Sequence, residues 1–178
     1  MKILGIIGGM SPESTATYYT EINRLVNQKK GGNISAPIVM VSVEFEEIVQ
    51  CQKQSEWQRA GEILAEAGKK LEMIGAEGIV LATNTMHKVA PQIERALSIP
   101  FLHILDATAD AIKSRGLNKV ALLGTKFTMS DNFYRDGLIV RGITPIVPNE
   151  SAQNEIHRII FDELCVGKFL PQSKAFYL

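Results

Sequence analysis

Apolar residues occur along this chain in short runs, and longer segments with helical spacing of apolar and polar positions separate the runs. The runs predict strands at residues 2–7, 37–43, 78–82, 100–103, 119–123 and 143–147. The separating segments predict helices at residues 12–28, 55–74, 89–97, 106–114, 130–141 and 151–166. Apolar strands that alternate with helices are typical of a parallel sheet covered by helices on both faces. The pattern therefore predicts an α/β fold.

A weak internal repeat predicts two domains of similar design. Ile-Ile-Gly-Gly at residues 6–9 closes the first strand of the opening half, and Leu-Leu-Gly-Thr at residues 122–125 closes the first strand of the later half. In the opening half, about 35 positions separate the second strand from the third. With the same separation in the later half, the third strand would fall beyond residue 178. We therefore expect a first α/β domain at residues 1–100 and an incomplete second one at 101–178, without its third strand and C-terminal helix.

Composition and charge exclude several functional classes. The chain has 178 residues and a formal net charge of zero, and no basic stripe or charged block indicates nucleic-acid binding. No apolar run approaches a membrane span, and the first strand is too short for a signal peptide. The two cysteines, Cys51 and Cys165, lack the spacing of a disulfide framework or a metal site. We expect a cytoplasmic protein with no metal, nucleic-acid or membrane partner.

The stretch Gly-Gly-Met-Ser-Pro-Glu-Ser-Thr at residues 8–15 joins the first strand to a helix. Glycines let the backbone approach a ligand closely, and the start of a helix offers N–H groups and a positive dipole end to an anion. A dinucleotide site requires Gly-x-Gly-x-x-Gly and a well-placed acidic residue, and the spacing here differs. The stretch favours a small carboxylate ligand, and a tight turn without a ligand remains the alternative.

A second polar turn, Thr83-Asn84-Thr85, directly follows the apolar run that ends at Ala82. In open α/β sheets, ligands bind at the carboxyl ends of the strands, where this turn is expected. Asn84 can donate and accept hydrogen bonds, and Thr85 offers a hydroxyl and an N–H group. Helix capping by threonine and asparagine is the alternative explanation. The presence of two such turns in one chain favours a carboxylate site.

Three motifs together resemble the aspartate/glutamate racemase family: residues 8–15, the Asn-Thr-Met-His stretch at 84–87, and Glu-Leu-Cys-Val-Gly at 163–167. The resemblance implies two pseudo-symmetric Rossmann-like domains that face each other across a cleft, usually in a homodimer. It also implies racemisation of a small acidic amino acid without any cofactor. In this family two cysteines, one from each half, transfer the α-proton on opposite faces of the substrate.

The chain departs from the family pattern at both of these cysteines. Thr83 occupies the first position, and a threonine hydroxyl is a much weaker acid than a thiol. The second cysteine is expected after the missing third strand. We predict that Cys51 and Cys165 lie in helical segments with buried, structural roles. The resemblance links members with threonine at the first position to broader or different acidic substrates.

The remaining candidate residues are assigned to substrate binding. Met10 and Ser11 are expected to line one wall of the site, with Asn84 and Thr85 beside the catalytic candidate Thr83. Thr125 and Thr128 follow the glycine turn of the later half and are expected to hold the ligand carboxylate from that side. For His87, orientation of the site and helix packing are equally plausible. His103 and His157 are expected to be structural, and Trp57 to pack or to join a dimer interface.

The sequence thus predicts a racemase that transfers the α-proton of aspartate or glutamate between two bases, with impaired activity. One alternative is a non-catalytic remnant that binds a carboxylate through residues 8–11 and 83–85. Another is a different reaction on a related scaffold, such as decarboxylation or cis–trans isomerisation. Those reactions also call for a cysteine at a strand end, and the chain has none at either position.

Overall fold

A computed structural model describes all 178 residues, which divide into two compact units, Met1–His103 and Ile104–Leu178. The strands of the first unit are β1 (Leu4–Gly8), β2 (Ile38–Ser42), β3 (Gly78–Leu81) and β4 (Phe101–Leu102). Its helices are α1 (Pro12–Lys30), α2 (Phe45–Lys53), α3 (Trp57–Met73), the 3₁₀ helix η1 (Thr85–Val89) and α4 (Ala90–Ala96). The unit extends to His103 because β4 pairs with β3.

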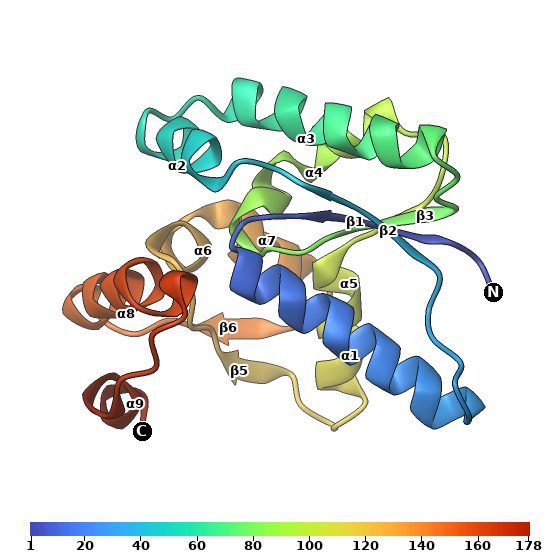
Figure 1. Cartoon of the computed structure of the whole chain (residues 1–178). Helices are drawn as coiled ribbons and strands as arrows, with labels where there is room; N and C mark the ends of the chain where they lie inside the picture. The colour runs from blue at the N-terminus through green and yellow to red at the C-terminus, as the bar shows by residue number, and fades with distance from the viewer. The chain divides into compact units, whose positions relative to one another are not determined.

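The four strands of the first unit form one parallel sheet in the order β2-β1-β3-β4. Helices α2 and α3 lie on one side of this sheet and α1 lies on the other (Figure 1). All the strands point the same way, so the turns that follow β1 and β3 lie at the same edge of the sheet. The predicted α/β fold with a parallel sheet is therefore confirmed.

The core of the first unit lies between this sheet and α3. Ile7 and Leu81 from the strands pack with Leu64 and Leu71 from α3, and all four side chains are fully or almost fully buried. Two neighbouring core strands carry the polar turns at their carboxyl ends. The close packing of the strands therefore holds those turns in a fixed relative position.

The second unit has a smaller parallel sheet, formed by β5 (Lys119–Ala121) and β6 (Thr144–Ile146). Its helices are α5 (Ile104–Lys113), α6 (Lys126–Ser130), α7 (Asn132–Val140), α8 (Glu150–Asp162), the 3₁₀ helix η2 (Leu164–Val166) and α9 (Pro171–Tyr177). A separate core joins Leu105 and Ala109 of α5 to Leu138 of α7 and to Ile143.

The predicted helices are present with shifted bounds. The predicted helix at residues 130–141 is α7, which begins after the extended residue Asp131, and the short helix α6 ahead of it was not predicted. The segment predicted as one helix at 151–166 ends at Asp162 and continues as η2. Helix α2 lies ahead of α3 as a separate helix, with Ser55 at a positive φ of 59° in the joining turn. No helix has both the length and the apolar content needed to cross a membrane.

Candidate functional site

The two polar turns predicted from the sequence lie side by side at the carboxyl edge of the first sheet. The N–H of Ala82 donates to the carbonyl of Ile7 at 2.9 Å, which aligns the ends of β3 and β1. The hydroxyl of Ser14, in the first turn of α1, donates to the Ala82 carbonyl at 3.2 Å. This contact joins residues 68 positions apart. The structure therefore brings the two motifs together.

The turn between β1 and α1 is built from glycine and three hydroxyl groups. Gly9 has a φ of 95°, and its N–H donates to the Thr15 hydroxyl at 2.8 Å. That hydroxyl in turn donates to the Ser11 carbonyl at 2.9 Å, and the Ser11 hydroxyl accepts the Ser14 N–H at 3.4 Å as the cap of α1. Met10 and Ser11, both assigned to substrate binding from the sequence, are buried in this turn.

Gly9 is required at its position for two independent reasons. Its positive φ is a conformation that L-amino acids with a side chain rarely adopt. A Cβ atom there would lie 2.3 Å from the carbonyl oxygen of Val43, which is backbone and has no rotamer to change. The turn can approach the residues after β2 this closely only because Gly9 has no side chain.

The turn after β3 presents its side chains at different depths. Thr83 is half-buried and Asn84 is exposed, whereas Thr85 is 5% exposed. Asn84 begins η1 without a capping hydrogen bond from its side chain, so the structure does not support helix capping as the reason for this asparagine. Thr83 and Asn84 are thus the two residues of this turn whose side chains reach solvent.

His87 is buried directly behind Thr83. Its Nδ1 lies 2.7 Å from the Thr83 carbonyl, which can only accept, so Nδ1 carries the proton of the neutral ring. Burial, together with the nearby His103, lowers the pKa of His87 from 6.5 to about 4. The His87 ring centroid lies 4.8 Å from that of His103 and 5.7 Å from that of Phe101. Both neighbours come from the end of β4.

In the second unit, Thr125 and Thr128 bond to each other. Thr125 caps α6, accepting the Thr128 N–H at 3.2 Å, and the two hydroxyl oxygens are 3.2 Å apart. Next to them, the Lys126 N–H donates to Nδ1 of His157 at 3.1 Å. Partial burial and the Lys126 charge lower the pKa of His157. His157 thus holds the first turn of α6, in keeping with the structural role expected for it.

The two cysteines differ in their surroundings. Cys51 in α2 is buried, as predicted, and burial together with the nearby Glu56 and Glu47 raises the pKa of its thiol. Cys165 in η2 is partly exposed, so its predicted burial is wrong. The reason is that α8 ends at Asp162, before the residue reaches the helical core face. Neither cysteine lies at the carboxyl end of a strand.

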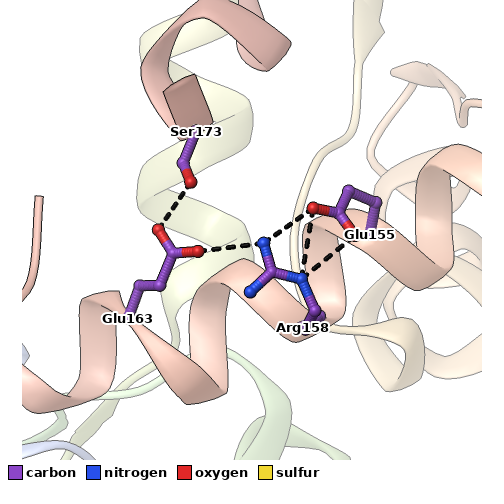
Figure 2. Close-up of polar contacts among 4 residues, drawn as sticks. All are labelled: Glu155, Arg158, Glu163 and Ser173. Atoms are coloured by element: carbon purple, nitrogen blue, oxygen red, sulfur yellow. Dashed lines mark hydrogen bonds and ion pairs between the residues drawn. The ribbon is translucent and has the colours of Figure 1, made fainter. Parts of the chain in front are cut away.

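The third sequence motif, residues 163–167, begins with a buried carboxylate. Glu163 is 4% exposed and accepts hydrogen bonds from the Ser173 hydroxyl at 2.6 Å and from Nη2 of Arg158 at 2.9 Å. Arg158 also pairs with Glu155 at 2.7 Å, so one chain of contacts connects α8 to α9 (Figure 2). Glu163 of this motif therefore links α8 to α9.

Two other features of the chain do not suit a small acidic ligand or a metal. No cluster of three or more His, Cys, Asp or Glu side chains is close enough to hold a metal ion. A pocket of about 560 Å³ lies against α9, but its lining is mostly apolar and includes Ile159, Leu164 and Tyr177. Such a lining does not suit a charged amino acid.

The edge of the first sheet brings together polar groups of the kinds that can bind a carboxylate. Hydroxyl, amide and backbone N–H groups gather around Thr83, and the neutral His87 lies behind it. Sequence reasoning did not assign a role to Ser14 or Thr15, although both belong to the 8–15 motif. The available signal was their spacing of three and four residues from Ser11, which places all three hydroxyls in the first helical turn.

Comparisons with known proteins identify the family of this chain. The family model described as Asp/Glu/hydantoin racemase matches residues 7–178. The broad-specificity amino-acid racemase RacX of Bacillus subtilis (strain 168) is 25% identical over 160 residues, covering 89% of this chain and 69% of RacX.

Solved structures give the same result. A candidate Asp/Glu racemase from Yersinia pestis is 49% identical with a TM-score of 0.89, and the match covers 99% of this chain and 77% of the other. An aspartate racemase homologue from Pyrococcus horikoshii OT3 is 40% identical with a TM-score of 0.79, covering 94% and 74%. The aspartate racemase of Picrophilus torridus, at 24% identity and a TM-score of 0.74, covers 99% and 71% and supports the fold alone.

Proposed function

The chain belongs to the Asp/Glu/hydantoin racemase family, and we propose that it moves the α-proton of an acidic amino acid without a cofactor. The observation that carries this proposal is the contact between the two family motifs, made by the Ser14 hydroxyl and the Ala82 carbonyl. That contact places the start of α1 beside Thr83, so groups that bind a carboxylate lie next to a group that could exchange a proton.

Carboxylate binding is assigned to both turns of the first unit. The first turn of α1 offers backbone N–H groups near Met10 and Ser11, at the positive end of a 19-residue helix. Asn84 and Thr85 supply amide, hydroxyl and backbone groups from the neighbouring strand end. A carboxylate held by several such donors stabilises the carbanion that forms when the α-proton leaves. In the second unit, Thr125 and Thr128 are proposed as the corresponding carboxylate contacts.

Thr83 is proposed as the proton-transfer residue of the first unit. A hydroxyl is a weaker acid than a thiol and so makes a slower acid/base catalyst near neutral pH. Racemisation with inversion needs a second group on the opposite face of the substrate, and neither cysteine is placed at a strand end to supply it. We therefore propose slow α-proton exchange and impaired racemisation.

The substrate is proposed to be aspartate, glutamate or both. Glu44, Glu46 and Glu47 stand at the start of α2, immediately after β2. Acidic groups at this position do not favour a site built to hold the side-chain carboxylate of aspartate alone. A cytoplasmic homodimer is part of the same proposal, and sedimentation equilibrium at two protein concentrations tests the dimer.

A second candidate function is binding of an acidic amino acid without catalysis. The observation that favours it is the hydroxyl of Thr83 at the position of the family's cysteine. One experiment separates the two functions: NMR detection of ligand binding and of α-proton exchange in D2O, with both enantiomers of aspartate and glutamate and with alanine as control. Binding with exchange supports catalysis, and binding without exchange supports the second function. The absence of both would refute the proposed site.

A further inference from the structure

The side chain of His87 holds the backbone of the Thr83 turn from inside the protein. The Thr83 carbonyl accepts a hydrogen bond from Nδ1 of His87 at 2.7 Å, and the backbone N–H of His87 donates to the Asn84 carbonyl at 3.1 Å. His87 belongs to η1 and is 3% exposed, so water does not compete for these contacts. The orientation of the Thr83–Asn84 peptide therefore depends on this ring.

The His87 ring is itself fixed from the other side. Its centroid lies 5.7 Å from that of Phe101 with the planes at 55°, and 4.8 Å from that of His103 with the planes at 60°. Phe101 lies in β4 and His103 follows that strand. The ring is thus packed between the turn after β3 and the end of the neighbouring strand, which leaves it little freedom to rotate.

The tautomer of His87 follows from its acceptor. A carbonyl oxygen cannot donate, so Nδ1 must carry the proton and Nε2 must carry none in the neutral ring. Because the Nδ1 proton is committed to this hydrogen bond, His87 holds the turn and does not transfer a proton at Nδ1.

We propose that His87 is a positioning residue for the reaction at Thr83. It holds the peptide group between Thr83 and Asn84 so that the Thr83 hydroxyl and the Asn84 side chain face the substrate. This inference rests on the proposed function. A peptide group is planar, so fixing the Thr83 carbonyl also fixes the direction of the Asn84 N–H. Misplacement of a reacting group by as little as an ångström costs about 10²-fold in rate.

Two variants separate the hydrogen bond from the packing. His87→Asn places an amide N–H close to the position of Nδ1 and keeps a donor for the Thr83 carbonyl. His87→Phe keeps an aromatic ring against Phe101 and His103 but removes the donor. If His87 only fills space, the phenylalanine variant should bind and exchange more like the native protein. If His87 positions the turn, the asparagine variant should be the more native-like of the two.

The test is an NMR series on the whole chain. Multiple-bond ¹H–¹⁵N spectra of the native protein identify the His87 tautomer, and titrations with glutamate and aspartate give the dissociation constant for each variant. In the native protein we expect the Nδ1–H tautomer. In His87→Phe, the affinity for the amino acid and the rate of α-proton exchange should each fall at least about tenfold. In His87→Asn, both values should stay within about threefold of native. An Nε2–H tautomer overturns the proposal by itself, whether or not the variants fold. Native-like binding and exchange in His87→Phe also overturn it.

Failure of the proposed function gives a different result. If the native chain binds and exchanges neither amino acid, the catalytic proposal falls. The role of His87 in holding the turn is then judged on its tautomer and on the amide shifts of Thr83 to Thr85. Those shifts should move in His87→Phe and stay near native in His87→Asn. The opposite pattern would show that the ring acts by packing alone.

Discussion

Acidification should destabilise this protein through His87 by an amount that the structure allows us to work out. The buried ring has a pKa of about 4 in the folded chain, while an unfolded histidine titrates near 6.5. Between these values the unfolded chain binds more protons than the folded one, so stability falls as the pH falls. The loss of stability due to His87 begins as the pH falls below about 6.5. It grows through the window between the two pKa values and reaches its full size below about pH 4.

The magnitude follows from linkage. One pH unit across this window is worth about 1.4 kcal/mol, so the gap between about 4 and 6.5 corresponds to roughly 3 kcal/mol in total. At about pH 5 the loss relative to about pH 7.5 is roughly 2 kcal/mol. His87 is almost fully buried, so solvent screening does not reduce this value.

Urea denaturation of the native chain and of His87→Asn at about pH 7.5 and about pH 5 measures the effect. Titrating groups away from His87, such as His157, are present in both proteins, so their contributions cancel in the comparison. The native chain should lose roughly 2 kcal/mol more than His87→Asn over this range. Equal losses in the two proteins would mean that folding does not lower the pKa of His87.

Three sets of substitutions test other parts of the structure. Gly9→Ala should cost about 3 kcal/mol of stability in a urea melt, because it adds a backbone clash with Val43 to the positive φ. Gly116→Ala is the control: this glycine also has a positive φ but lies in open space at the end of a helix, so its replacement should cost about 1 kcal/mol, and similar costs would contradict the clash. Glu163→Ala should speed amide hydrogen exchange in α9 and lower the free energy of unfolding by about 2 kcal/mol. Glu163→Gln should lower it less, because its side-chain oxygen still accepts from Ser173. Unchanged exchange would show that this carboxylate does not attach α9. Thr83→Cys should raise the rate of α-proton exchange in D2O by roughly 10²-fold, since a thiol is the better acid/base group, and an unchanged rate would place the proton transfer elsewhere.

Much of the fold was predictable from the sequence because local signals agreed with each other. Pro12 and Ser11 mark the start of α1, and the apolar runs coincide with strands, of which β1 is buried along almost its whole length. The two turns at 8–11 and 83–85 were located because polar residues directly follow those strands. Signals of this kind depend only on neighbours in sequence.

The features that were missed depend on contacts between distant segments. The bond from Ser14 to Ala82 joins two motifs that have no sequence relation, and the burial of His87 results from packing against the end of β4. Helix α6 was missed because its five residues, Lys126–Ser130, are too few to show a helical period of apolar positions. Cys165 was predicted to be buried because its surroundings looked helical, and the early end of α8 leaves it partly exposed.

The proposed function requires that the α-proton of an acidic amino acid be exchanged at the turn around Thr83. The most direct test compares the rate of α-deuterium incorporation into glutamate and aspartate for the native chain and for Thr83→Val, which keeps the shape of the side chain and removes its hydroxyl. We expect slow incorporation by the native protein, none into alanine, and at least a tenfold loss in the variant. Equal rates in the two proteins, or no incorporation into either acidic amino acid by a folded native sample, would contradict it.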